Sequence, residues 1–266
     1  MTSLFRQDWT KALLPVMDVL ESEACFRTYS LWLSDNNQEL EEKAMHKVLK
    51  RLLKYEPLQY ILGEAWFYGM GLRVNKNTLI PRPETEELCE LIIKSTTNNS
   101  LKILDVGTGS GCIPIALLKN KPCWKATALD IEAGALQIAK ENAIQQGILD
   151  RVIFIQTDFI NDFITSDKWD IIVSNPPYID SAEQSEMLKN VLEWEPHAAL
   201  FPEGKDPLIF YKKLAELLKT QSAGCNLWAE INPALAEETL LIFKEFSEKV
   251  LIKDMSGKQR FIHAVK

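Results

Sequence analysis

The sequence predicts an α/β protein in which a small helical domain precedes a mainly parallel sheet of seven strands whose last strand is antiparallel. From residue 101 onward, short apolar runs alternate with helical stretches, which is typical of a parallel sheet. These runs lack the every-second-residue alternation of a half-exposed strand, so we expect helices on both faces of the sheet. Before residue 60 the apolar spacing is helical, and no strand-like alternation occurs.

The composition is that of an ordinary globular protein and argues against several classes of function. The 266 residues are 46% hydrophobic and 25% charged, which is enough to bury a sizeable core without a metal or a disulfide. The formal net charge is -7, whereas proteins that grip nucleic acid usually carry a basic surplus. We therefore expect no stable nucleic-acid binding.

Cysteine usage and hydropathy favour a cytoplasmic location. The five cysteines include no C-x-x-C pair, and we expect free, buried thiols in a reducing compartment. No apolar stretch is long enough to span a membrane, and the N-terminal sequence lacks the apolar region of a secretory signal. The three histidines lie far apart without metal-ligand spacing, so no metal site is expected.

Residues 1–63 are expected to form the helical domain. Apolar residues recur at three- and four-residue spacing from Leu13 to Leu20, and again from Met45 to Leu53. A basic stripe lies on the opposite face of the second stretch, comprising Lys43, Lys47, Lys50, Arg51 and Lys54. Such a stripe is either the solvated face of an amphipathic helix or a docking face for a large acidic or RNA-like partner.

Residues 64–82 are expected to form a β-hairpin that links the two domains. Two short extended runs lie around Gly69 and Gly71, and the polar residues 75–77 form a turn. Pro81 and Pro83 stiffen the exit, and a helix restarts at Glu84. The acidic residues of IPRPETEE (80–87) either stabilise this helix start or serve a site at the domain junction.

Residues 83–266 hold the predicted sheet. The strands are expected at 101–106, 124–130, 151–156, 169–174, 225–231, 249–254 and 260–265. Helices are expected at 112–120, 132–146, 207–220 and 233–247, with an irregular segment at 175–206. Only residues 255–259 join the last two strands, which is too short for a parallel crossover, so the last strand must run antiparallel.

A glycine-rich loop follows the first strand of this sheet. The loop comprises Gly107, Thr108, Gly109, Ser110 and Gly111, and its alternate glycines allow a ligand to approach the backbone. Ligands of open parallel sheets bind at the carboxyl ends of the strands, where Asp130 ends the next strand. A carboxylate there can accept hydrogen bonds from two ribose hydroxyls. Loop and carboxylate together predict an adenosine-type ligand, and the alternative is a tight turn beside a surface Asp.

A second polar motif, SNPPYI (174–179), follows the fourth strand and should lie at the same edge of the sheet. Asn175 carries one acceptor and one donor group, while Pro176 and Pro177 expose carbonyl oxygens without competing N–H groups. Tyr178 adds a flat ring, so the motif can hold a planar NH₂ group between acceptors. The motif contains no His, Lys, Asp or Glu, which indicates catalysis by orientation rather than by a general base. The alternative is a Pro-rich turn with a buried Tyr.

Phe159 follows the third strand, where an aromatic ring can lie on an adenine face. The alternative is an ordinary core Phe beneath the sheet.

Five segments of the chain carry a family resemblance. They are QYILGEAWFYG (59–69), LIPRPETEEL (79–88), LDVGTGSGCIPIAL (104–117), SNPPYI (174–179) and EPHAALF (195–201). Together they closely resemble the HemK/PrmC family, the protein-(glutamine-N5) methyltransferases that modify the Gly-Gly-Gln motif of class I peptide chain release factors. The resemblance covers essentially the whole chain. NPPY alone is not specific, because adenine-N6 DNA methyltransferases share it.

The resemblance implies a Rossmann-like class I methyltransferase fold, S-adenosylmethionine as the cofactor, and class I release factors as the partners. It implies that Gly107, Thr108, Gly109, Ser110 and Gly111 form the cofactor loop, that Asp130 binds the ribose, and that Phe159 lies beside the adenine. Asn175 would touch cofactor and substrate, and Pro176, Pro177 and Tyr178 would complete the catalytic glutamine pocket. The domain of residues 1–63 would recognise the protein substrate, and residues 83–266 would form the methyltransferase domain.

The sequence departs from the family pattern at two positions. Phe159 stands where the family often has Trp, and Asn232 stands where the family commonly has Gly, so no role is assigned to Asn232. Two other functions stay open: an adenine-N6 methyltransferase acting on DNA or RNA, and a catalytically inactive adaptor of the same fold. The first requires a basic cleft or a recognition domain, and the second should not bind the cofactor.

Overall fold

The computed structural model describes residues 2–202, 204 and 206–266, which form two compact units. The first, called the helical unit, contains the chain up to Gly63 together with Met187–Trp194. The second, called the sheet unit, contains Glu64–Glu186 and Glu195–Lys266. Among the described residues, no helix is long and apolar enough to cross a membrane.

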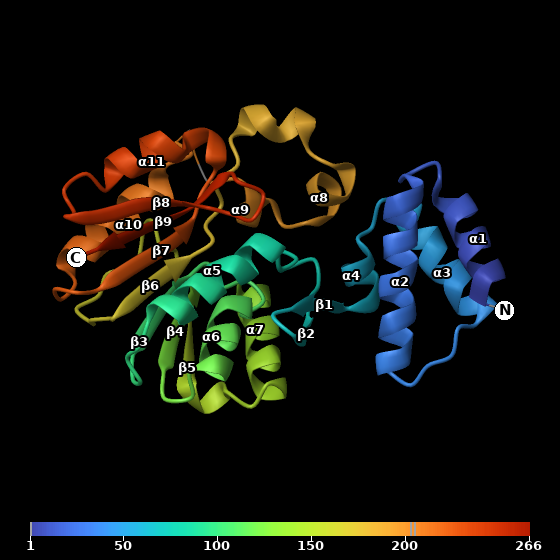
Figure 1. Cartoon of the computed structure of the whole chain (residues 1–266), viewed down its shortest axis with the longest axis horizontal. Coiled ribbons are helices and arrows are strands. Elements are labelled where there is room, and N and C mark those ends of the chain that lie inside the picture. The colour runs from blue at the N-terminus through green and yellow to red at the C-terminus, as the bar shows by residue number, and fades with distance from the viewer. Residues whose placement is uncertain (1, 203, 205) are drawn as a thin grey trace. The chain divides into compact units, whose positions relative to one another are not determined.

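The helical unit is built around a cluster of aromatic side chains. Its helices are α1 (Thr2–Leu13), α2 (Val19–Asp35), α3 (Glu42–Leu52), α4 (Leu58–Leu62) and α8 (Lys189–Trp194) (Figure 1). Trp9 is fully buried and stacks on Tyr29, with ring centroids 5.3 Å apart, and Phe26 contacts Trp9 edge-on. Trp194 donates a hydrogen bond to the carbonyl of Lys54 over 3.0 Å, which fastens α8 to this unit.

The prediction of one helical face from Leu13 to Leu20 is wrong. The helix α1 ends at Leu13, and α2 begins only at Val19. Pro15 lies between them, and a proline in a helix interior removes a backbone donor and clashes with the preceding turn. The Leu20 side chain consequently faces solvent and is 78% exposed.

The amphipathic pattern predicted from Met45 to Leu53 is confirmed in α3 as far as Leu52, but Leu53 follows the helix and is 39% exposed. Met45, Leu49 and Leu52 are buried on one face. On the other face the guanidinium of Arg51 donates a hydrogen bond to Glu56 over 2.6 Å. The charge of Arg51 is therefore already paired within the unit, whereas the four lysines of the stripe are exposed.

The sheet unit contains a hairpin and the predicted seven-stranded sheet. The hairpin pairs β1 (Glu64–Phe67) antiparallel with β2 (Met70–Arg73). The sheet strands are β3 (Lys102–Val106), β4 (Lys125–Asp130), β5 (Val152–Gln156), β6 (Ile171–Ser174), β7 (Asn226–Glu230), β8 (Glu248–Lys253) and β9 (Gln259–Val265). Their order is β5-β4-β3-β6-β7-β9-β8, in which β9 runs antiparallel to both β7 and β8, and the pairs from β5 to β7 are parallel. The predicted sheet, with its antiparallel last strand, is confirmed.

Helices cover both faces of this sheet. One layer contains α5 (Pro83–Ser95), α6 (Cys112–Asn120) and α7 (Ala133–Gln145), and the other contains α10 (Ile209–Thr220) and α11 (Ala236–Ile242) (Figure 1). Neighbouring residues of the central strand β3 pack on opposite faces of the sheet. Ile103 belongs to the core on the side of α5, α6 and α7, and Leu104 belongs to the core on the side of α10 and α11. Short 3-10 turns occur at Leu149–Arg151, Ser181–Glu186 and Pro233–Leu235.

Three sequence predictions fail in detail. The edge strand β5 is not covered on both faces, since Ile153 is 65% and Ile155 is 40% exposed. The reason is that residues 157–170 form no helix to cover it. The segment 175–206 is not wholly irregular, because it contains α8 and α9 (His197–Leu200). Among the cysteines, Cys123 is exposed.

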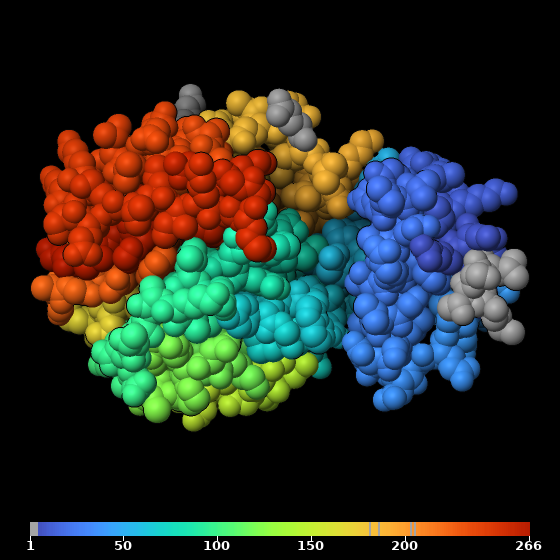
Figure 2. Space-filling model, viewed as in Figure 1, coloured from blue at the N-terminus to red at the C-terminus, as the bar shows by residue number. Residues whose placement is uncertain are grey.

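The acidic residues at the start of α5 fasten this helix to its surroundings. Glu86 accepts a hydrogen bond from the backbone N–H of Tyr68 in the hairpin over 2.9 Å. Glu87 accepts one from the backbone N–H of Met255, in the β8–β9 turn, over 3.0 Å. In Figure 2, red atoms from this C-terminal part of the chain accordingly lie against the blue-green atoms of α5. These two carboxylates hold the framework and do not face the cavity described below.

Candidate active site

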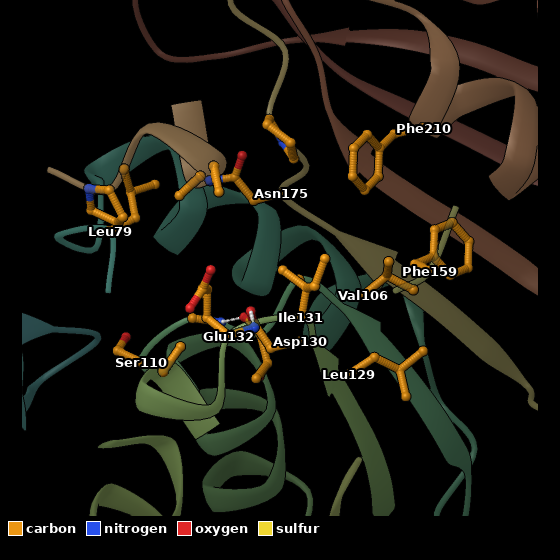
Figure 3. Close-up of a pocket in the computed structure, with 18 of the residues that line it drawn as sticks. Leu79, Val106, Ser110, Leu129, Asp130, Ile131, Glu132, Phe159, Asn175 and Phe210 are labelled. Carbon is orange, nitrogen blue, oxygen red and sulfur yellow. Dashed lines mark hydrogen bonds between the residues drawn. The ribbon is translucent and has the colours of Figure 1, made fainter. Parts of the chain in front are cut away.

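A cavity of about 420 Å³ opens at the carboxyl ends of four neighbouring strands of the sheet unit. Its walls come from the loops that follow β3, β4, β5 and β6, so it lies where a parallel sheet is expected to bind a ligand (Figure 3). The volume is in the range of small-molecule sites. The glycine loop, Asp130, Phe159 and Asn175 all line it, and Figure 3 shows Asn175 and Asp130 on separate walls.

The three glycines of the loop have conformations that other residues rarely adopt. Their φ values are +76° at Gly107, +55° at Gly109 and +80° at Gly111. A Cβ atom added at Gly107 or Gly109 would meet no heavy atom within 4 Å, whereas one at Gly111 would lie 3.1 Å from Ala139 Cβ. The first two glycines therefore give an open cradle, and the third permits α6 and α7 to pack closely.

Asp130 ties the glycine loop to the end of β4. Its Oδ2 accepts a hydrogen bond from Gly109 N over 2.8 Å, and its Oδ1 accepts one from Glu132 N over 3.0 Å (Figure 3). Burial raises the pKa of Asp130, while these backbone hydrogen bonds oppose the rise. Each carboxylate oxygen keeps a further lone pair, so the group can still accept ligand hydroxyls.

Several buried polar groups in the loop and just before it have no hydrogen-bond partner among the residues that the structure describes. They are both carboxylate oxygens of Asp105 and the hydroxyls of Thr108 and Ser110. Burial raises the pKa of Asp105 to about 7, and the nearby Thr108 hydroxyl opposes only part of this rise. The geometry between this hydroxyl and the carboxylate is not that of a hydrogen bond. Unpaired buried polar groups are rare in folded proteins. Since Thr108 and Ser110 also line the cavity, they suit a ligand with a polar end.

Two aromatic rings form the apolar end of the cavity. Phe159 follows β5, and Phe210 comes from α10; the rings stack with centroids 6.3 Å apart (Figure 3). Phe159 therefore fits both interpretations of the sequence, because it is buried in the core and also lines the cavity. Phe210 was not found from the sequence, since an apolar residue on an amphipathic helix gives no signal of its own.

The two polar side chains of the NPPY motif are held by hydrogen bonds to two buried residues, Thr85 and Glu230. Asn175 Nδ2 donates to Thr85 Oγ1 over 3.0 Å, and Tyr178 Oη donates to Glu230 Oε1 over 2.8 Å. Burial, together with the negative charge of Glu230, raises the pKa of Tyr178. Asn175 and Pro177 line the cavity, whereas Pro176 and Tyr178 lie behind this surface. Thr85 also lines the cavity, although no pattern in the sequence predicted a role for it.

Glu195 lies behind another wall of the cavity and holds two of its segments together. Its buried carboxylate accepts hydrogen bonds from Ile80 N over 3.1 Å and from Arg82 Nη2 over 2.5 Å. These bonds join the PRP segment to Pro196, and both segments line the cavity. The motifs at residues 79–88 and 195–201, which both carry the family resemblance, therefore form one wall together.

Asn232, which departs from the family pattern, has a structural role. Its Oδ1 accepts a hydrogen bond from Ala234 N over 2.9 Å, which caps the 3-10 turn after β7. Its Nδ2 donates to Glu183 over 2.7 Å and to the carbonyl of Tyr178 over 3.3 Å. The substitution thus supports the backbone of the NPPY motif without lining the cavity.

The fold and the glycine-loop cavity define a class of enzyme. The family described as the methyltransferase small domain matches residues 85–226. A solved methyltransferase from Pyrococcus furiosus shares the fold with a TM-score of 0.55 and 17% identity, covering 82% of this chain and 96% of that one. The protein is an S-adenosylmethionine-dependent methyltransferase of the class I fold.

Closer relatives identify the family. The release factor glutamine methyltransferase of Flavobacterium psychrophilum is 41% identical over 97% of this chain and 96% of its own length. That of Bacteroides thetaiotaomicron is 43% identical over 84% of this chain and 81% of its own length. The chain belongs to the release factor glutamine methyltransferase family.

Proposed function

We propose that the protein transfers a methyl group from S-adenosylmethionine to the side-chain amide nitrogen of the glutamine in the Gly-Gly-Gln motif of class I peptide chain release factors. The observation that carries this proposal is that one cavity has the glycine loop on one wall and Asn175 on another, in a chain of this family. A methyl donor and a planar amide can thereby meet inside the same cavity.

The cavity suits S-adenosylmethionine at both of its ends. The polar end, with Thr108 and Ser110, would hold the methionine portion, and Asp130 would accept hydrogen bonds from the ribose hydroxyls. The apolar end, with Phe159 and Phe210, would cover the adenine. When bound, the cofactor supplies a methyl group on a positively charged sulfur, which is an activated leaving group.

The NPPY motif would orient the glutamine amide. Asn175 Oδ1 would accept an amide hydrogen on the cavity side, where Pro177 also lies, while Pro176 and Tyr178 would support this wall from behind. An amide nitrogen is a weak nucleophile because its lone pair is delocalised, so fixing it in line with the methyl group supplies much of the acceleration.

No side chain is needed as a general base in this scheme. The Glu230 carboxylate lies behind the motif, but each of its oxygens already accepts a hydrogen bond, from Tyr178 and from Thr85. The amide proton would leave to water once the nitrogen has been methylated. The role of the protein is therefore to orient the reactants.

We infer that the helical unit recognises the release factor and contributes little to cofactor binding. The exposed lysines of α3 offer a surface for an acidic partner. No stable nucleic-acid binding is proposed, because the chain carries a formal net charge of -7. Free cysteines suit a cytoplasmic location.

Transfer of labelled methyl groups from S-adenosylmethionine tests this function. We expect label in a class I release factor and none in the factor whose motif glutamine is changed to alanine. Label in adenine-containing DNA or RNA, with none in the factor, would support the adenine-N6 alternative. Failure to bind S-adenosylmethionine in equilibrium dialysis would support the inactive adaptor.

A further inference from the structure

A buried relay of side chains connects the NPPY motif to the start of α5 and to the end of β7. Asn175 Nδ2 lies 3.0 Å from Thr85 Oγ1, which in turn lies 2.9 Å from Glu230 Oε2. Thr85 is 2% exposed and Glu230 is 1% exposed, so water does not compete for these bonds. Thr85 and Glu230 are 145 positions apart in the sequence and meet only in the folded chain.

The direction of each hydrogen bond in the relay follows from the chemistry of Glu230. An ionised carboxylate only accepts hydrogen bonds, so the single hydroxyl hydrogen of Thr85 points to Glu230. The Thr85 oxygen is then left as an acceptor, and only the NH₂ group of Asn175 can satisfy it. The amide of Asn175 therefore has one permitted orientation.

This orientation leaves Asn175 Oδ1 available on the cavity side. Among the described residues, none donates a hydrogen bond to Asn175 Oδ1. A reversed amide would place two hydrogen-bond donors toward the substrate NH₂ group, which itself needs acceptors. The relay thus decides whether the site accepts or repels a planar NH₂ group.

We propose that Thr85 and Glu230 are positioning residues that fix the side-chain amide of Asn175 with its oxygen toward the methyl acceptor. The proposal rests on the proposed function, since it assigns these residues a part in orienting the glutamine amide. Neither residue needs to touch the substrate's reacting nitrogen for this role.

The surroundings of Glu230 hold its carboxylate in place. Tyr178 Oη donates to Oε1 over 2.8 Å, and Tyr211 Oη donates to the Glu230 backbone carbonyl over 3.0 Å. Burial raises the pKa of Glu230, while the bonds from Tyr178 and Thr85 and the nearby charge of Arg260 oppose the rise. The same carboxylate therefore orients both side chains of the motif that can hydrogen-bond, Asn175 and Tyr178.

Single-turnover methylation of a release factor by Thr85 variants tests the relay. Thr85→Val keeps the shape and removes the hydroxyl, and we expect a loss in rate of roughly 10-fold to 10²-fold without a comparable loss of cofactor affinity. Thr85→Ser keeps the hydroxyl and should restore most of the rate. Glu230→Gln, which can donate to Thr85, should lower the rate as Thr85→Val does.

A double-variant comparison separates positioning from a merely structural effect. If Thr85 acts through Asn175, then Thr85→Val should cause no further loss of rate in an Asn175→Ala background. The matched control is Thr239→Val, because Thr239 in α11 is also fully buried and, among the described residues, its hydroxyl donates to the backbone carbonyl of Leu235 alone. This control should lower stability and leave the rate unchanged.

Three results would overturn the inference: a normal rate in Thr85→Val, no rescue by Thr85→Ser, or losses that multiply in the double variant. Should Thr85→Val not fold, side-chain NMR of the wild-type chain decides. The amide signals that disappear in Asn175→Ala should show slow hydrogen exchange, and fast exchange would contradict the relay. Failure of the wild-type protein to methylate any release factor would remove the proposed function, while the NMR result would still test the relay.

Discussion

The two walls of the cavity are built by different means. The glycine loop is shaped by its backbone, with positive φ at Gly107, Gly109 and Gly111, and no described residue fills the space beside Gly107 and Gly109. The NPPY wall is shaped by side chains, since Asn175 and Tyr178 take their positions from bonds to Thr85 and Glu230. A loop of this kind is specified locally, whereas the second wall depends on partners far away in the chain.

This difference suggests a division of labour. The backbone cradle provides affinity for the parts of the cofactor that do not react and therefore differ little between the ground state and the transition state. The side-chain relay provides orientation, which matters most when the methyl group moves. Variants of the first wall should therefore change binding, and variants of the second should change the chemical rate.

The largest effect is expected at Asn175. Asn175→Ala removes the orienting acceptor and should lower the single-turnover rate roughly 10²-fold or more. Asn175→Asp keeps an acceptor oxygen but loses the donor to Thr85 and adds a negative charge near the sulfonium. It should tighten cofactor binding without restoring the rate. A rate near that of the wild-type protein in either variant would contradict the division of labour.

The next effect is expected at Asp130, on the other wall. Asp130→Ala should weaken S-adenosylmethionine binding by about 1.5–3 kcal/mol, because hydrogen bonds to a charged group are lost. Asp130→Asn should lose less, since one acceptor oxygen remains. Isothermal calorimetry compares the two variants with the wild-type chain, and unchanged affinity in both would remove Asp130 from the site.

The sequence could predict the first wall because its requirements are local. Alternate glycines after a buried strand, followed by a strand ending in Asp130, are signs of a backbone cradle. The same logic predicted the antiparallel direction of the last strand, since five residues cannot make a parallel crossover. These features follow from chain geometry over short distances.

The second wall could be predicted only in part. The sequence motif NPPY indicated a site by itself. Thr85 lies in a segment that is typical of an acidic helix start, and Glu230 lies where an ordinary strand ends, so neither could be assigned to the site from the sequence. Phe210 and the exposed face of β5 were missed for a related reason, because each depends on which helix covers which part of the sheet. Tertiary contacts decide these features, and a single sequence does not show them.

The buried carboxyl group of Asp105, next to the glycine loop, predicts that the stability of the protein depends on pH. The pKa of Asp105 is raised from 3.8 to about 7, so its stabilising contribution is present below pH 4 and is lost as pH rises through about 7. Relative to Asp105→Asn, the wild-type free energy of unfolding should fall between about pH 4 and pH 8, on the order of 1 kcal/mol or more. Urea denaturation of both proteins at pH 4 and pH 8 measures this change in the free energy of unfolding. If the two proteins differed in this free energy by the same amount at both pH values, the prediction would be wrong.

The smallest effect is expected outside both walls, on α3. Reversing Lys43 and Lys47 to Glu should raise the Michaelis constant for the release factor by about two- to fivefold at low salt. The effect should fade as salt increases. The control reverses Lys244 and Lys253, two exposed lysines of the sheet unit, with the same change in net charge. If both pairs of substitutions raised the Michaelis constant equally, the helical unit would have no recognition role.

The central claim is that the two walls bring a methyl donor to a glutamine amide, and locating the transferred methyl group tests it most directly. The release factor is methylated with S-adenosylmethionine carrying a trideuterated methyl group and is then fragmented in a mass spectrometer. The account predicts one trideuteromethyl group, on the side chain of the glutamine in the Gly-Gly-Gln motif, with a strong reduction by Asn175→Ala. A methyl group on any other residue, or equal labelling by Asn175→Ala, would contradict it.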